Sequence, residues 1–140
     1  MINSRPKGLT LIEVLIVITI IGILAGMILP NLMKKPDQAR IIAAKQDIAT
    51  ILQALEIYKL DNYSYPSVTQ GLQSLITKPI QEPDAANWAG PYLKKIPIDP
   101  WGNLYQYNVN SEDEVNIISF GADNLEGGEG VNADISSSGF

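Results

Sequence analysis

Two parts of this 140-residue sequence contain residues whose types and spacing suit a chemical role. The first is a single carboxylate, Glu13, inside an apolar stretch that runs from Leu9 to Leu29. The second is the segment 123–134, where carboxylates and amides lie among glycines. The first arrangement predicts charge pairing in an apolar environment, and the second suggests cation binding.

The position of Glu13 is unusual because an ionised side chain at the centre of a membrane helix costs roughly 2.5–3.5 kcal/mol on insertion scales. Such a residue usually has a function and a partner. A short basic leader, residues 1–8, ends immediately before Leu9. A free amine created at Leu9 would be a natural partner for the carboxylate.

The acidic segment has the residue types of a calcium loop, because calcium takes six to eight oxygen ligands from carboxylates, amides, carbonyls and water. Its glycines allow the backbone to turn tightly. It is not an EF-hand, since Leu125 stands where the third-position Asp or Asn is needed. From composition alone, a solvated acidic loop is the simpler interpretation, because Asp, Asn and Gly are ordinary turn residues.

Composition excludes several classes of function. The sequence has no histidine and no cysteine, which removes Ser-His-Asp triads, Cys-His dyads and histidine zinc sites. The formal charge is −5, and residues 112–134 contain acids but no Lys or Arg. A nucleic-acid binder needs a basic surface, so we expect no nucleic-acid partner.

The stretch 9–29 is long enough, at about 1.5 Å per residue, to cross the hydrocarbon core of a membrane as a helix. A buried core helix and a cleaved secretory signal peptide are the alternatives. The residues after Ala25 lack the small-residue pattern of a signal cleavage site, which argues against the second. Arg5 and Lys7 precede the span, so we expect a cytoplasmic N-terminus.

Downstream of Pro30, apolar residues recur at three- and four-residue steps and predict an amphipathic helix that ends near Asp61 and Asn62. Its buried face is Ile41, Ala44, Ile48, Ile51, Leu52, Leu55 and Tyr58. A short helix is expected over 69–77, followed by a proline-rich connection that Trp88 and Tyr92 pack down. Residues 104–108 and 115–120 predict a β-hairpin, with a weaker third strand near 133–135.

Residues 7–14, Lys-Gly-Leu-Thr-Leu-Ile-Glu-Val, together with the apolar run resemble the prepilin signature of type IV pilins and related filament subunits. In that family a membrane peptidase cleaves after the glycine and methylates the new N-terminus. The resemblance implies cleavage between Gly8 and Leu9, although the family usually has Phe in place of Leu9. We expect Glu13 to pair with the Leu9 amine of a neighbouring subunit, because a close pair offsets much of the cost of burying two charges.

The C-terminal half narrows the resemblance to the major pseudopilins of type II secretion systems. The matching segments are 58–66, 70–75, 99–105, 119–123, 126–130 and 132–135. The resemblance implies an α+β, pilin-like fold: a long N-terminal helix, half membrane-embedded and half amphipathic, packed on a short helix and a small antiparallel sheet. It divides the chain into a leader (1–8), a transmembrane and assembly segment (9–29) and a periplasmic domain (30–140).

The resemblance also implies a calcium ion in the loop near 120–135. Asp123 and Asp134 would give side-chain oxygens, and Phe120 and Leu125 would give backbone carbonyls. Asn132 stands where many relatives have Asp, so its coordination is expected to be weaker or water-mediated. The ion would be structural.

The implied function is that of a non-enzymatic filament subunit that drives export of folded proteins across the bacterial outer membrane. Its partners would be further copies of itself, minor pseudopilins, the inner-membrane assembly platform and a prepilin peptidase. A type IV pilin or competence pseudopilin is one alternative, which a cysteine pair or a basic groove would favour. An enzyme tethered by one helix is the other, and the sequence offers it no activated nucleophile.

Overall fold

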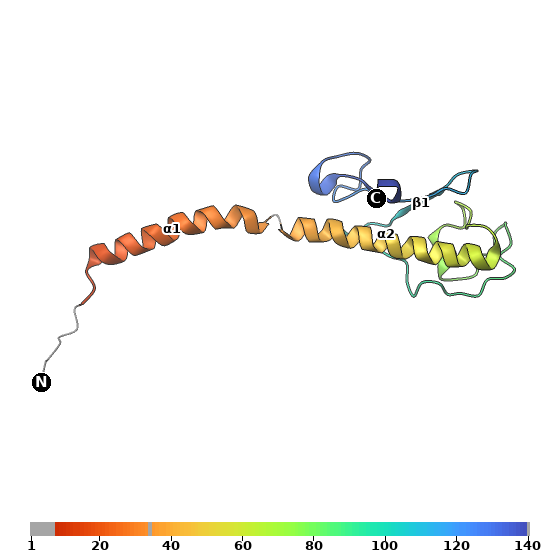
Figure 1. Cartoon of the computed structure of the whole chain (residues 1–140), viewed down its shortest axis with the longest axis horizontal. Coiled ribbons are helices and arrows are strands. Elements are labelled where there is room, and N and C mark those ends of the chain that lie inside the picture. Colours follow the sequence, from red (N-terminus) through yellow and green to blue (C-terminus); the bar gives the residue numbers. More distant parts are fainter. Residues whose placement is uncertain (1–7, 34, 140) are drawn as a thin grey trace, which may run out of the picture. The chain divides into compact units, whose positions relative to one another are not determined.

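The computed structural model describes residues 8–33 and 35–139, and for residues 28–33 and 35 it describes the backbone alone. The chain divides into two compact units, Met1–Asp37 and Gln38–Phe140. Figure 1 shows the elements in chain order. They are α1 (Leu11–Met33), α2 (Lys35–Asn62), η1 (Leu72–Leu75), β1 (Gln106–Val109), β2 (Val115–Ser119), η2 (Gly130–Asn132), β3 (Ile135–Ser136) and η3 (Ser137–Gly139).

Helix α1 begins two residues after Leu9, and its bounds include Pro30. The helical backbone therefore extends beyond the proline. Within the part of the chain that the structure describes, no helix is both long enough and apolar enough to cross a membrane. Residues 1–7 of the expected leader lie outside the described residues.

Helix α2 provides the centre of the core in the second unit, and the predicted apolar face is confirmed. Ala44, Ile48, Ile51, Leu55 and Tyr58 are buried, with Ile41 and Leu52 partly buried beside them. Complete burial of one of the isoleucine or leucine side chains stabilises the fold by roughly 1.5–3 kcal/mol. The helix ends at Asn62, where predicted, and the next residue, Tyr63, has a left-handed φ of 65°.

The predicted hairpin is confirmed, with shifted bounds. Strands β1 and β2 pair antiparallel, with Tyr107 opposite Ile117, and β3 adds to β2 in the order β1-β2-β3. Leu104 lies before β1, and it forms an isolated antiparallel bridge with Ile98 across the intervening turn. Ile117 and Ile135 face the core, so the short sheet contributes its buried side chains to the cluster on α2.

The expected helix over 69–77 is instead a single 3-10 turn, Leu72–Leu75. The preceding residues form a turn of their own, in which the amides of Gln70 and Gly71 donate to the carbonyl of Ser67. Gly71 has a φ of 57°, which interrupts right-handed helix before the 3-10 turn starts. Leu72 and Leu75 still face inward, as their spacing predicts.

Side chains fasten the proline-rich connection to the core. Trp88 donates from Nε1 to the carbonyl of Ser74 at 2.8 Å, and Tyr92 packs edge-on against Tyr58 with ring centroids 5.5 Å apart. The predicted roles of Trp88 and Tyr92 are thereby confirmed. Gln70, which is buried, donates to the carbonyls of Gln81 and Pro83, both at 2.7 Å. Buried polar groups need such partners, so this segment is held by specific hydrogen bonds.

Candidate functional site

The first candidate site is the start of the apolar helix. Gly8 and Leu9 precede α1, and Leu9 is 78% exposed. A Cβ added to Gly8 would meet no atom within 4 Å. The described atoms therefore leave space around both residues, as a processing site requires.

Glu13 lies in the first turn of α1 and contacts Thr10 in both directions. The backbone amide of Thr10 lies 3.4 Å from Glu13 Oε2, and the amide of Glu13 donates to Thr10 Oγ1 at 3.3 Å. This reciprocal arrangement is a capping box, which satisfies backbone donors that an N-terminal turn leaves without partners. The sequence analysis missed this contact, although the spacing Thr-x-x-Glu is its recognised signal.

The side chains of α1 are apolar on all sides, and those described are largely uncovered. From Leu11 to Met27 its large apolar side chains are between 47% and 83% exposed. Glu13 and Thr19 are the polar exceptions, and the hydroxyl of Thr19 donates to the carbonyl of Leu15 at 2.7 Å. Gly22 and Gly26, four residues apart, would have no atom within 4 Å of an added Cβ. This surface needs an apolar partner, because exposure to water is unfavourable for every one of these side chains.

The second candidate site is the acidic loop that joins β2 to β3. The amide of Ala122 donates to the carbonyl of Val131 at 2.9 Å, which closes the loop on itself. A Cβ on Gly121 would lie 2.7 Å from the same carbonyl oxygen, and Gly121 has a φ of 65°. Only glycine fits this close approach of the two ends of the loop.

The structure places the two predicted carboxylate ligands on the exposed surface of this loop. Oδ1 of Asp123 accepts from the amide of Leu125 at 3.1 Å, and Oδ2 of Asp134 accepts from the amide of Gly127 at 2.9 Å. Asn132 is partly buried at the closed end, near Val131. Phe120, the first of the predicted carbonyl ligands, directly follows the last residue of β2.

Across residues 8–33 and 35–139, no three acidic side chains gather closely enough to hold a metal ion. The predicted ligand set does not require three acidic side chains. It consists of two carboxylates, one side-chain amide and two main-chain carbonyls. All of these are oxygen donors of the kind that calcium binds. The loop is also closed by its own backbone hydrogen bond, so the predicted ligands from its two ends belong to one folded unit. The donor atoms of these residues are of the types that calcium binds, so their chemistry fits the ion.

Comparisons with known proteins cover nearly the whole chain. Residues 31–138 match the family described as "Type II secretion system (T2SS), protein G", and residues 3–29 match the prokaryotic N-terminal methylation motif. The type II secretion system core protein G of Pseudomonas aeruginosa is 47% identical over 135 residues, covering 95% of each chain. The corresponding protein of Vibrio cholerae is 45% identical over 133 residues, covering 94% of this chain and 90% of that one.

The chain belongs to the type II secretion system protein G family.

The fold of the chain is that of a major pseudopilin. The crystal structure of the major pseudopilin from the type 2 secretion system of enterohaemorrhagic Escherichia coli matches it with a TM-score of 0.66 and 34% sequence identity. The match covers 77% of this chain and 94% of that chain. It confirms the expected family and the expected pilin-like α+β class. Between the major pseudopilin and the type IV pilin alternative, the family match decides for the first.

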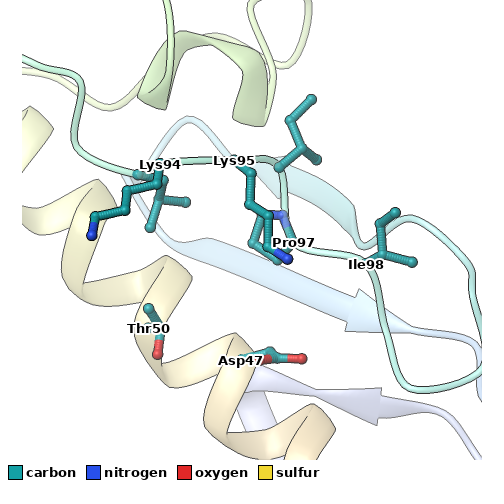
Figure 2. Close-up of a pocket in the computed structure, with 8 residues that line it drawn as sticks. Asp47, Thr50, Lys94, Lys95, Pro97 and Ile98 are labelled. Atoms are coloured by element: carbon teal, nitrogen blue, oxygen red, sulfur yellow. The ribbon is translucent and has the colours of Figure 1, made fainter.

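The protein also has a cavity of about 460 Å³ between α2 and residues 93–98. Figure 2 shows Lys94 and Lys95 on one side and Asp47 and Thr50, from α2, on the other. The Asp47 carboxylate accepts from the hydroxyl of Tyr105 at 3.0 Å, and burial, aided by that bond, raises the pKa of the phenol. Thr50 donates its hydroxyl to the carbonyl of Gln46. The cavity wall therefore carries one carboxylate, from Asp47, opposite two cationic side chains, from Lys94 and Lys95.

Proposed function

We propose that this protein polymerises through α1 into a periplasmic filament that drives export of folded proteins across the outer membrane. The observation that supports this most strongly is the exposure of apolar side chains on every side of α1. Before assembly, lipid would cover these side chains. In the filament, the same helix from other subunits would cover them, so leaving the membrane need not expose them to water.

The proposed processing step creates the amine that would pair with the Glu13 carboxylate. A prepilin peptidase would cleave between Gly8 and Leu9 and methylate the Leu9 amine. Leu9 is exposed and lies beside the first turn of α1, which suits access by the enzyme. In the filament the new amine of one subunit would meet the Glu13 carboxylate of the next. The capping contact with Thr10 would hold that carboxylate at the helix terminus until then.

The proposed location follows from the same segment. The mature chain would be a single-pass protein of the bacterial inner membrane, with residues 9–29 in the bilayer, the N-terminus in the cytoplasm and residues 30–140 in the periplasm. Its partners would be copies of itself, the minor pseudopilins and the inner-membrane assembly platform. We expect a mechanical role without catalysis.

The loop 120–135 is proposed to hold a structural calcium ion. Asp123 and Asp134 would supply carboxylate oxygens, Phe120 and Leu125 main-chain carbonyls, and Asn132 a weaker amide ligand. The ion would neutralise part of an acidic segment that contains no Lys or Arg. In a chain without cysteines it would add a cross-link that a disulfide cannot provide.

Replacing the parent bacterium's copy of the gene tests this function. Cells that carry wild-type protein should secrete folded substrates through the type II system, and mass spectrometry should find a mature N-terminus of methylated Leu9. Cells that carry Gly8→Leu should keep the leader and lose secretion, although the periplasmic domain is unchanged. Normal secretion by cells in which Gly8→Leu protein remains uncleaved would overturn the proposal.

A further inference from the structure

Asp99 is a buried carboxylate close to the acidic loop. Its residue is only 4% exposed. One oxygen, Oδ1, accepts from the amides of Trp101 at 3.1 Å and Asn103 at 2.8 Å, and Oδ2 accepts from the hydroxyl of Ser119 at 2.6 Å. A buried charge is costly without such partners, so these three bonds hold the turn 99–103 and the end of β2 in one arrangement.

Ser119 connects the Asp99 carboxylate to the first residues of the loop. The side chain is fully buried, and Oγ accepts from the amide of Gly121 at 3.3 Å. The backbone amide of Asn103 is bound by Asp99, and its side-chain Nδ2 donates to the carbonyl of Gly121 at 3.3 Å. Both polar groups of the Gly121 backbone are therefore held by residues that Asp99 binds.

The hydrogen bond to the Gly121 amide also orients the carbonyl of Phe120. The carbonyl of Phe120 and the amide N–H of Gly121 belong to the same peptide unit, which is planar and trans. Fixing the direction of the Gly121 N–H therefore fixes the opposite direction of the Phe120 carbonyl. That carbonyl is one of the oxygens assigned to the calcium ion.

We propose that Asp99, acting through Ser119 and Asn103, is a positioning residue that aims the Phe120 carbonyl at the cation of the loop. The inference rests on the calcium site proposed above. Partners behind the first ligands commonly change metal affinity by 10- to 100-fold when removed. A role limited to holding the turn would lower stability without changing affinity for the ion.

Calorimetric titration of the purified full-length protein in detergent with CaCl2, paired with melting in EGTA, tests the inference. We expect Ser119→Ala to raise the calcium Kd about 10-fold or more, and Asn103→Ala, a milder change at a partly buried side chain, to raise it in the same direction. Tyr105→Phe is the matched control, because it removes one hydrogen bond of a buried side chain to Asp47 and leaves the loop contacts in place. Its Kd should equal that of the wild type.

The possible outcomes separate the two proposals. An unchanged Kd in both Ser119→Ala and Asn103→Ala, with wild-type protein that binds calcium, would overturn the positioning role and leave the calcium site standing. Failure of the wild-type protein to bind calcium would overturn both. If Ser119→Ala does not fold, the Kd of Asn103→Ala decides the question, since its hydrogen bond lies nearer the surface.

Discussion

The hydroxyl of Tyr65 donates a 2.5 Å hydrogen bond to Oε1 of Glu56 on α2. Two more tyrosines bind carboxylates on the same helix: Tyr92 donates to Asp61 at 2.8 Å and Tyr105 donates to Asp47 at 3.0 Å. These bonds join α2 to the segment that follows it directly and to two segments that are distant along the chain. In a protein without disulfides, they help to fix the connection and the sheet on the helix.

This arrangement predicts loss of stability in alkali. Burial first, and then the bond to Glu56, raise the pKa of Tyr65 to about 12, against an ordinary value of 10.0. Between these two pH values the unfolded chain loses the phenolic proton while the folded chain keeps it, so stability falls as pH rises. Urea denaturation should give the same midpoint at pH 7 and 9 and a lower one at pH 11. Tyr65→Phe should show a smaller fall, and a fall equal to that of the wild type would contradict this explanation.

Truncation of the buried face of α2 should be costly. Ile51 is fully buried, and Ile51→Ala should lower the free energy of unfolding by about 2–5 kcal/mol because it leaves a cavity. Ile42→Ala is the matched control on the same helix, since Ile42 is 57% exposed, and it should change stability by no more than about 0.5 kcal/mol. Denaturant unfolding of the purified protein measures both. Equal effects would mean that the core is not where the structure places it.

Two neighbouring glycines in the acidic loop should respond differently to alanine. Gly127 and Gly128 both have left-handed φ angles, 97° and 84°. A Cβ on Gly128 would lie 2.4 Å from the carbonyl oxygen of Asn132, whereas a Cβ on Gly127 would meet nothing within 4 Å. Gly127→Ala should cost only the backbone strain, about 1–3 kcal/mol, and Gly128→Ala should cost more and weaken calcium binding. A milder effect at Gly128 would show that the loop is not closed as described.

Calcium should stabilise the protein in a concentration-dependent way. At free calcium about 100 times the Kd, binding adds about 2.7 kcal/mol to the stability of the folded state. Thermal melting with calcium, with EGTA and with magnesium at equal ionic strength measures the effect. Only calcium should raise the Tm, and Asp134→Asn should remove most of the rise. A Tm that EGTA does not change would rule out a stabilising ion.

The helix, the hairpin and the family were predictable because their signals are periodic or local. The stripe that includes Ile48, Ile51 and Leu55 follows the 3.6-residue helical repeat, and the strands follow alternation between turn residues. Burial of Asp99 and Ser119 was not predictable, because a polar residue has no hydrophobic pattern and becomes buried only when distant partners satisfy it.

The candidate sites were predictable only in part for the same physical reason. Composition marked only an acidic, glycine-rich loop, and the family resemblance singled out Asp123 and Asp134 as expected ligands. It did not reveal how the loop closes through Ala122 and Val131, because that contact depends on tertiary folding. The capping box at Thr10 and Glu13 is local, so its spacing was a usable signal.

The central claim is that Glu13 is needed for its negative charge, as partner of the Leu9 amine of another subunit, and not only for its capping bond. Glu13→Gln separates these roles, because Gln can occupy the same position of a capping box without a charge. Thr10→Val is the complementary variant, since it removes the capping hydroxyl and keeps the carboxylate.

The decisive measurement is the amount of filament formed in cells by wild-type, Glu13→Gln and Thr10→Val protein, counted by electron microscopy and by immunoblot of sheared fractions. Mass spectrometry should find the same mature N-terminus in all three. We expect Glu13→Gln to stay in the membrane without filaments and Thr10→Val to form most of the wild-type amount. Filaments from Glu13→Gln in wild-type amount, or their loss only in Thr10→Val, would contradict the account.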